Sequence, residues 1–173
     1  MSRQIRLIST SIGWMLILAA AAFSQLSVSA VAVSLFPVGR YESKVGVGYG
    51  GLAGFEVGDA EGLSFTGRSG YLRHLERDHS LVSLIPILGG FKSSTRDGAI
   101  YMAGELGAAL THTRDSGPLA SGNSFKTNPA WAIGLGSAAG SLDLRFSFQV
   151  WDARHTAQSM SLGLSFGFLL RGA

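Results

Sequence analysis

Four charged residues stand out because each lies in a stretch that is otherwise apolar or rich in small residues: Arg68, Glu105, Asp143 and Arg145. Arginine and carboxylate side chains form short, charge-assisted hydrogen bonds when a fold brings them together. Away from water, a charge of this kind is costly unless it has a partner. The four residues could therefore form an ion-pair network if they all face the same side of the fold.

The side that these residues face can be read from the alternation around them. In the stretch 140–151, apolar residues recur at every second position, which is the period of a β strand and not of a helix. The apolar positions are Leu142, Leu144, Phe146, Phe148 and Val150, and the polar ones are Ser141, Asp143, Arg145, Ser147 and Gln149. In a soluble ligand-binding barrel the apolar face would cover the core, whereas in an outer-membrane β-barrel it meets lipid and the polar face lines the interior.

The composition favours the membrane setting. The chain has 173 residues, enough for one domain, with 24 glycines, 14% charged residues and a mean hydropathy of +0.28. Beyond the N-terminus no apolar run approaches the roughly 18 residues of a membrane helix, and a closed β-barrel is another way to satisfy the backbone in lipid. The absence of cysteine excludes a disulfide framework, a zinc–thiolate site and a cysteine nucleophile. The net charge of +3 does not indicate nucleic-acid binding, since losing two N-terminal arginines would leave 12 basic against 11 acidic residues.

The N-terminal residues 1–22 predict a secretory signal peptide. Two arginines precede a short apolar segment that ends in small residues, as such signals do. We expect cleavage before Phe23, with cleavage as late as residue 32 as an alternative, and an uncleaved membrane anchor as the other interpretation. Residues 23–173 would then form the outer-membrane barrel domain.

The alternation continues along the chain and predicts eight strands, or seven if the stretch 26–36 belongs to the signal. The expected strands are 26–36, 41–57, 63–71, 81–91, 100–111, 131–136, 140–151 and 159–170, with Pro86 marking a bulge or local break. Bacterial barrels have even strand numbers, short periplasmic turns and longer outer loops. An eight-strand count places 37–40, 75–80, 112–127 and 152–157 outside, and 58–62, 93–98 and 139–140 inside. The predicted fold class is therefore all-β: an antiparallel up-and-down transmembrane β-barrel after a signal peptide.

Several glycine- and aromatic-rich segments strengthen this interpretation. They are Val45-Gly-Val-Gly-Tyr-Gly50, Tyr101-Met-Ala-Gly-Glu-Leu-Gly107, Trp131-Ala-Ile-Gly-Leu-Gly136, Leu142-Asp-Leu-Arg145 and Leu162-Gly-Leu-Ser-Phe-Gly-Phe168. On these segments the chain resembles the small eight-stranded outer-membrane barrels, the broad opacity-protein or porin-like family. The resemblance implies residence in the outer membrane of a Gram-negative envelope and insertion by the barrel-assembly machinery.

Basic residues gather at the predicted outer rim of the barrel. They are Arg40, Arg73, Arg77, Arg114, Lys126 and Arg154. Arginine side chains at the outer leaflet can pair with the phosphates of lipopolysaccharide. Alternatively, nearby acidic residues neutralise most of this charge: Glu76, Asp78, Asp115 and Asp152.

Within this frame the sequence predicts a structural or surface-interaction role, with a lumen plugged by the ion-pair network of Arg68, Glu105, Asp143 and Arg145. A narrow porin-like channel is one alternative, and a lipid A-modifying enzyme is another. Some small outer-membrane barrels that deacylate lipid A use a histidine and a serine two residues later, but here Ala157 holds that place and Ser159 lies four residues after His155. We therefore expect no catalytic residues, cofactor or metal. The oligomeric state stays open.

Overall fold

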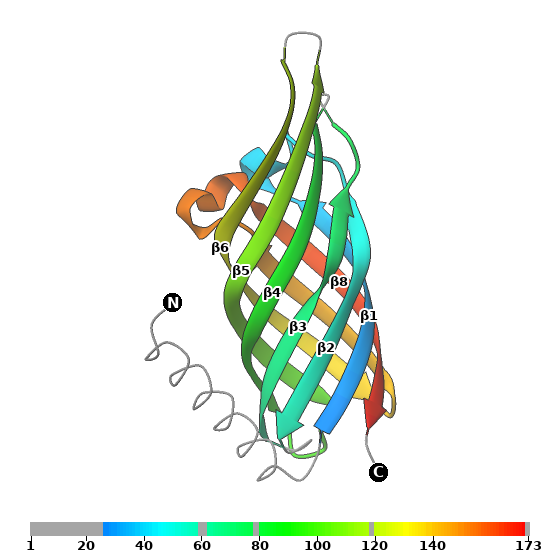
Figure 1. Ribbon diagram of the computed structural model, residues 1–173. Helices are drawn as coiled ribbons and strands as arrows, with labels where there is room; N and C mark the ends of the chain where they lie inside the picture. The colour runs from blue at the N-terminus through cyan, green and yellow to red at the C-terminus, as the bar shows by residue number, and fades with distance from the viewer. Residues whose placement is uncertain (1–25, 59–61, 78–79, 118–119, 172–173) are drawn as a thin grey trace, which may run out of the picture.

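The computed structural model describes residues 26–58, 62–77, 80–117 and 120–171, and within them eight antiparallel strands close into a barrel (Figure 1). The strands are β1 (Leu26–Pro37), β2 (Gly48–Gly58), β3 (Leu63–His74), β4 (Ser80–Ser94), β5 (Ile100–Gly117), β6 (Ala120–Ala139), β7 (Leu142–Val150) and β8 (Met160–Arg171). Two short 3-10 helices, η1 (Gly39–Tyr41) and η2 (Ala153–Gln158), lie between strands at one end. None of the helices described is long and apolar enough to cross a membrane.

We call the end that carries η1, η2 and the β5–β6 hairpin the outer end, and the end where β1 begins and β8 finishes the inner end. This naming follows the usual arrangement of bacterial barrels, in which the longer connections face outward and the shorter turns face the periplasm. At the inner end the turn of residues 95–99 between β4 and β5 and the two-residue link between β6 and β7 are short. The predicted signal peptide, residues 1–22, lies outside the described residues.

The first strand is present and closes the barrel. Residues 27–35 of β1 pair with β2 on one side and with β8 on the other, so that Val31 lies opposite both Leu52 and Gly167. The count of eight strands is therefore confirmed over the alternative of seven. With eight strands, every strand has two neighbours and no edge is left unpaired, as a barrel in lipid requires.

The prediction of a polar loop over 112–127 was wrong. The chain there continues as two paired strands, with His112 opposite Phe125 and pairing that extends to Gly117 and Ala120. This long hairpin rises above the rest of the barrel at the outer end (Figure 1). Because both of its faces are largely polar, the hydrophobic alternation that marks a strand is lost, although backbone pairing still satisfies the peptide groups.

Pro86 interrupts pairing on one side of β4 only. The ladder between β3 and β4 is recorded at Leu72–Leu84 and resumes at Ser69–Ile87, whereas the pairing of β4 with β5 runs on through Pro86 and Ala109. Proline lacks the N–H that a strand donates to its neighbour. The predicted local break thus occurs, and β4 still forms one continuous strand.

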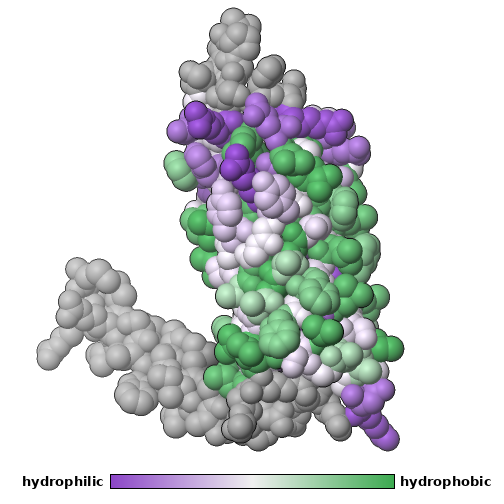
Figure 2. Space-filling model, turned by 90° about the vertical axis from the view of Figure 1, so that its right-hand side faces the viewer, coloured by the Kyte–Doolittle hydropathy of each residue, from purple (hydrophilic) through white to green (hydrophobic). Residues whose placement is uncertain are grey.

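Apolar side chains cover the outside of the wall. Exposed residues on this surface include Phe55, Phe91, Leu106, Ile133, Leu144, Phe146 and Phe166. Figure 2 shows apolar side chains over most of the barrel wall and hydrophilic ones gathered toward the outer end. The charges Asp143 and Arg145 point inward and Phe146 outward, so the soluble barrel with inverted faces is not the arrangement found.

Candidate functional site

The inner half of the lumen holds a buried carboxylate between two arginines. Glu105 of β5 receives two parallel hydrogen bonds from Arg145 of β7, with Nη1 and Nη2 at 3.0 and 2.9 Å from the two carboxylate oxygens. Arg68 of β3 approaches from the other side, its Nη2 atom 2.5 Å from Oε2, as an ion pair whose N–H is not aligned for a hydrogen bond. Glu105 and Arg145 are 4% and 8% exposed. This site is almost completely buried, borders a small cavity of about 60 Å³ and carries two cations for one carboxylate.

A second branch completes the charge balance. Asp143 accepts a hydrogen bond from Tyr101 (2.5 Å), so its recorded partner is a tyrosine and not an arginine. Lys92 donates to Glu56 (2.8 Å) and lies 4.5 Å from the centre of the Tyr101 ring. Together with Arg68, Arg145 and Glu105, the two branches contain three cations and three carboxylates. We call these six charged residues and Tyr101 the inner network.

Sequence reasoning did not assign Lys92, Glu56 or Tyr101 to the inner network. Glu56 and Tyr101 both occupy inward-facing positions in the alternation of their strands, so the sequence did indicate that they face the lumen. Alternation alone does not say which inward-facing residues lie at the same depth. Lys92 was missed because the expected strand ended one residue earlier, at Phe91, whereas β4 continues to Ser94.

Above the inner network apolar side chains fill much of the lumen, together with the buried polar side chains of Ser147, Gln149 and Ser161. The largest apolar side chains, Leu35, Leu72 and Leu84, are inward-facing residues of β1, β3 and β4 and are almost completely buried. They pack in one cluster with Val33, Leu52, Val82, Leu88 and several alanines. We call this cluster the apolar layer. A layer of this kind offers an ion nothing to replace its hydration shell, so it opposes ion passage.

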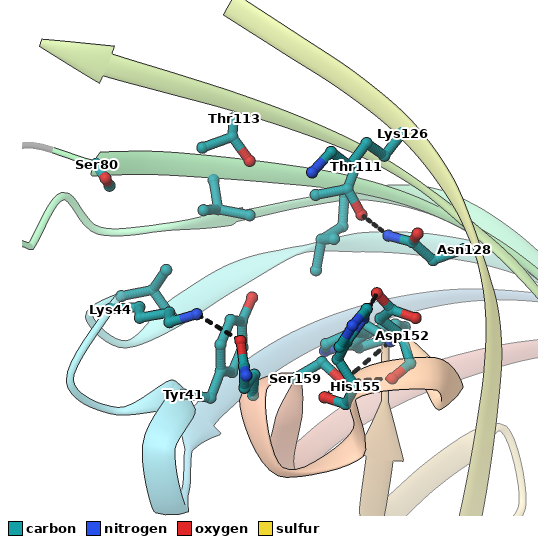
Figure 3. A pocket seen from close by; sticks show the side chains of 15 residues that line it. Tyr41, Lys44, Ser80, Thr111, Thr113, Lys126, Asn128, Asp152, His155 and Ser159 are labelled. Atoms are coloured by element: carbon teal, nitrogen blue, oxygen red, sulfur yellow. Dashed lines mark hydrogen bonds and ion pairs between the residues drawn. The ribbon is translucent and has the colours of Figure 1, made fainter. Parts of the chain in front are cut away.

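A cavity of about 540 Å³ opens above the apolar layer at the outer end (Figure 3). Its walls come from β4, β5, β6, η2 and the connection between η1 and β2, and its floor includes Trp151 and Val82. Lys44, Lys126, Asn128, Asp152 and His155 are among its polar lining residues. We call it the mouth cavity; sequence reasoning missed it because its walls come from distant parts of the chain.

The six basic residues of the predicted rim are all exposed, but they are spread around the outer end. Arg40 lies in η1, Arg73 in β3, Arg77 in the connection after it, Arg114 in β5, Lys126 in β6 and Arg154 in η2. Arg77 donates to the backbone oxygen of Glu42 (2.9 Å). Arg154 pairs with Asp152 and hydrogen-bonds the side-chain oxygen of Asn128. Of the predicted neutralising acids, Asp152 therefore does bind a rim arginine, and Asp78 lies outside the described residues.

His155 and Ser159, the nearest approach to a hydrolase pair, are both in the wall of the mouth cavity. His155 Nδ1 lies 3.1 Å from Asp152 Oδ2. Partial burial raises the pKa of the Asp152 carboxyl, but hydrogen bonds from His155 and Arg154 lower it by more, so the pKa lies below its ordinary value. Ser159 Oγ instead accepts from the backbone N–H of Asp152 and donates to the backbone oxygen of Asp152 (3.0 Å), with the carbonyl of His155 in η2 also within reach. Its recorded contacts hold the 3-10 helix in place, and none joins the hydroxyl to the imidazole. Within the described chain no group of three or more His, Asp or Glu residues could hold a metal.

The sequence matches no protein-family model and no curated protein. Several solved structures do share its fold. Ail, the attachment invasion locus protein of Yersinia pestis, is 13% identical with a TM-score of 0.58, and the match covers 86% of this chain and 97% of Ail. The N-terminal β-barrel domain of Pseudomonas aeruginosa OprF is 16% identical with a TM-score of 0.59 over 83% and 97% of the two chains. Neisserial surface protein A is 11% identical with a TM-score of 0.55 over 84% and 95%.

The chain has the fold of the small eight-stranded outer-membrane barrels. This agrees with the resemblance noted in the glycine- and aromatic-rich segments of the sequence. The closed barrel and the apolar belt around it indicate the outer membrane as the location of the protein, with membrane lipid as its surroundings.

Proposed function

We propose that this protein is a closed outer-membrane barrel with a structural or surface-interaction role, and that it is not a pore. The observation that carries the proposal is the filling of the lumen by two consecutive plugs, the inner network and the apolar layer. An interior of eight strands is narrow enough for side chains to fill it. Proteins of the same fold include an attachment and invasion protein and a surface protein, with which a surface role is compatible.

Ion conductance tests the closed lumen directly. The purified barrel, folded in lipid as judged by heat-modified gel mobility, should give no single-channel currents in a planar bilayer. Regular conductance steps from the folded protein would overturn the closed barrel and favour the narrow channel. Nothing in the geometry of His155 and Ser159 favours the lipid A-modifying enzyme, and mass spectrometry of lipid A from cells with and without the protein should show no difference.

We further propose that rim arginines contact the phosphates of lipopolysaccharide, with Arg73 and Arg114 as the leading pair. Both are exposed in the outer parts of β3 and β5, near the exposed aromatic residues Tyr71 and Phe125. Phe125 stacks on His112 (centroids 4.2 Å apart), which gives the outer wall the aromatic character of a membrane interface.

The lipopolysaccharide proposal predicts a selective loss of stability. Replacing both Arg73 and Arg114 with glutamine should destabilise the barrel in vesicles that contain lipopolysaccharide more than in phosphatidylcholine vesicles. Arg96, exposed in the turn at the inner end, is a matched control, because Arg96→Gln removes one charge far from the rim. Equal destabilisation in both kinds of vesicle would exclude this pair as phosphate contacts.

Export and insertion remain part of the same proposal. Cleavage before Phe23 leaves β1 intact, whereas cleavage after residue 30 or 32 would remove about half of it and its pairing with β2 and β8. We therefore propose the earlier site, followed by insertion through the barrel-assembly machinery. N-terminal sequencing of the envelope form should begin near Phe23; a sequence that begins at Met1 or Ser2 would favour the uncleaved anchor.

A further inference from the structure

The mouth cavity has the shape of a binding site and not of a passage. Its volume of about 540 Å³ falls within the range of small-molecule pockets. Val45, Val82, Leu84 and Trp151 line it from below, and the apolar layer continues beneath them. From its charge and lining we infer that this cavity binds a small sugar phosphate. The inference rests on the proposed function in one respect only, which is that the outer end of the barrel faces the cell exterior.

Two ammonium groups reach the cavity from separate parts of the chain. Lys44 lies in the connection between η1 and β2, and Lys126 lies on β6 on the other side of the cavity (Figure 3). Lys44 Nζ donates one hydrogen bond to Gln158 Oε1 (2.7 Å), which leaves two of its protons without a recorded acceptor. Lys126 makes no recorded hydrogen bond or ion pair within the described chain. A ligand that carries a dianionic phosphate and further acceptors would complement cations on these two sides of the cavity.

The acidic side chain of the cavity does not cancel this charge, because it is already engaged. Asp152 accepts from the backbone and side chain of Arg154 and from His155. Arg154 adds a further cation beside the cavity, hydrogen-bonded to Asn128. The groups left over in the walls are therefore mostly donors, and the complementary ligand is rich in acceptors.

The remaining lining suits a sugar through its hydroxyl groups. Tyr41 and Trp151 border the cavity but are only 7% and 2% exposed, so they offer little surface for a sugar ring to pack on. Thr111 and Thr113 bring hydroxyl groups to the opposite wall from Tyr41 (Figure 3), whereas the amide of Asn128 is bonded to Thr111 and Arg154. Trp151 is 2% exposed and its buried Nε1–H has no acceptor, which is an uncommon arrangement in a protein interior. Hydroxyl-bearing walls, two cations and a volume well beyond that of a phosphate ion together favour a phosphorylated sugar over a simple anion.

Titration with glucose 6-phosphate tests the inference. The folded barrel is placed in nanodiscs without lipopolysaccharide, and binding is followed by calorimetry and by the indole N–H resonance of Trp151, assigned with Trp151→Phe. We expect saturable binding that weakens with salt and shifts this resonance. Glucose and inorganic phosphate, each carrying one half of the ligand, should each bind at least tenfold more weakly.

The lysine variants assign the binding to the cavity. Lys44→Gln and Lys126→Gln should each weaken binding of glucose 6-phosphate about tenfold or more, since each removes a charged hydrogen bond. Both residues are exposed, so the variants should fold, and heat-modified mobility verifies this. Arg96→Gln, at the inner end, should leave binding unchanged. Equal affinity in the wild type and both lysine variants, equal binding of glucose or phosphate alone, or no binding at all would overturn the inference.

Two sources of such a ligand can be separated. The phosphorylated core sugars of neighbouring lipopolysaccharide would block glucose 6-phosphate once lipopolysaccharide is added to the nanodiscs, whereas a free sugar phosphate as natural ligand predicts that binding persists. Either result upholds the ligand chemistry. A conducting barrel that still binds would overturn only the closed lumen, and a silent barrel that does not bind would overturn only the sugar phosphate site.

Discussion

In the inner half of the lumen, charged side chains from β2, β3, β4, β5 and β7 pair with one another. The outer half is filled largely by apolar side chains, mostly leucine, valine and alanine, beside a few buried polar ones such as Gln149. Both fillings close the same narrow barrel, but they depend on different physics. The inner network is held by directional contacts between charged side chains that are almost completely buried. The apolar layer is held by packing, which lacks direction but responds to every change of volume.

This difference predicts how each half of the lumen loses stability when a side chain is replaced. Removing one member of a buried ionic network leaves its partners charged and unpaired, so the damage exceeds the loss of one contact. Removing methyl groups from the apolar layer leaves a void whose cost depends on how far the neighbours can relax. The inner network should therefore respond to charge and the apolar layer to volume.

The largest effect is expected at the centre of the inner network. Glu105→Ala leaves Arg68 and Arg145 buried without their shared carboxylate, and it should lower the free energy of unfolding by about 3–5 kcal/mol. Unfolding in lipid vesicles, followed by tryptophan fluorescence, measures the change. Glu105→Gln, which keeps the shape and removes the charge, separates the electrostatic part from the lost volume.

Double-mutant cycles then divide the coupling between the two arginines. Coupling of Glu105 to Arg145 should exceed coupling to Arg68, because Arg145 makes two aligned hydrogen bonds and Arg68 only an ion pair. Coupling indistinguishable from zero for both arginines would mean that water reaches these charges, and the contrast between the two halves would fail.

A slightly smaller effect is expected in the apolar layer. Leu72 is completely buried, and Leu72→Ala should cost about 2–5 kcal/mol through lost burial and the void that it leaves. The variant should still be silent in conductance measurements, because the inner network continues to close the lumen. Ion currents from Leu72→Ala would show that the apolar layer alone blocks the barrel.

Two neighbouring residues of β7 provide a third comparison, between the lipid side and the lumen side of the barrel wall. Leu144 is 51% exposed on the lipid side, and Leu144→Arg should cost about 2–4 kcal/mol if it lies near the middle of the bilayer. Its neighbour Arg145 faces the opposite way, and Arg145→Leu should act by leaving Glu105 with fewer partners. Equal tolerance of the two substitutions in lipid folding assays would contradict the orientation of β7.

The smallest effect is expected at the mouth, where water screens charge. The lowered pKa of Asp152 means that its contacts stabilise the folded state above the ordinary value of 3.8, and that this contribution disappears as the pH falls through the lowered value. Because His155 and Arg154 are exposed, the gain at neutral pH should stay below about 1 kcal/mol. The stability difference between wild type and Asp152→Asn, measured against pH, should shrink toward zero below about pH 4.

The sequence by itself determined which way most side chains point and reduced the strand count to eight or seven, with eight favoured by the even strand numbers of bacterial barrels. The two-residue period of a strand is a local property, so the outward side of Leu144 and the inward side of Glu105 and Arg145 could be read from neighbours alone. Boundaries were less certain, as Lys92 and the 112–127 hairpin show, because apolar alternation stops where a strand leaves the lipid.

Only the tertiary structure decided which inward side chains meet. Tyr101 and Asp143 are 42 residues apart and hydrogen-bond because the tilt and register of the strands place them at one depth. For the same reason the sequence did not reveal the apolar layer, whose members come from six strands, η1, the connection after η1 and the residue that follows β7. The mouth cavity depends further on how η1, η2 and the long hairpin fold around the opening. Whether a side chain points inward or outward follows from local alternation along its strand, whereas its depth along the barrel axis is set by how all eight strands close.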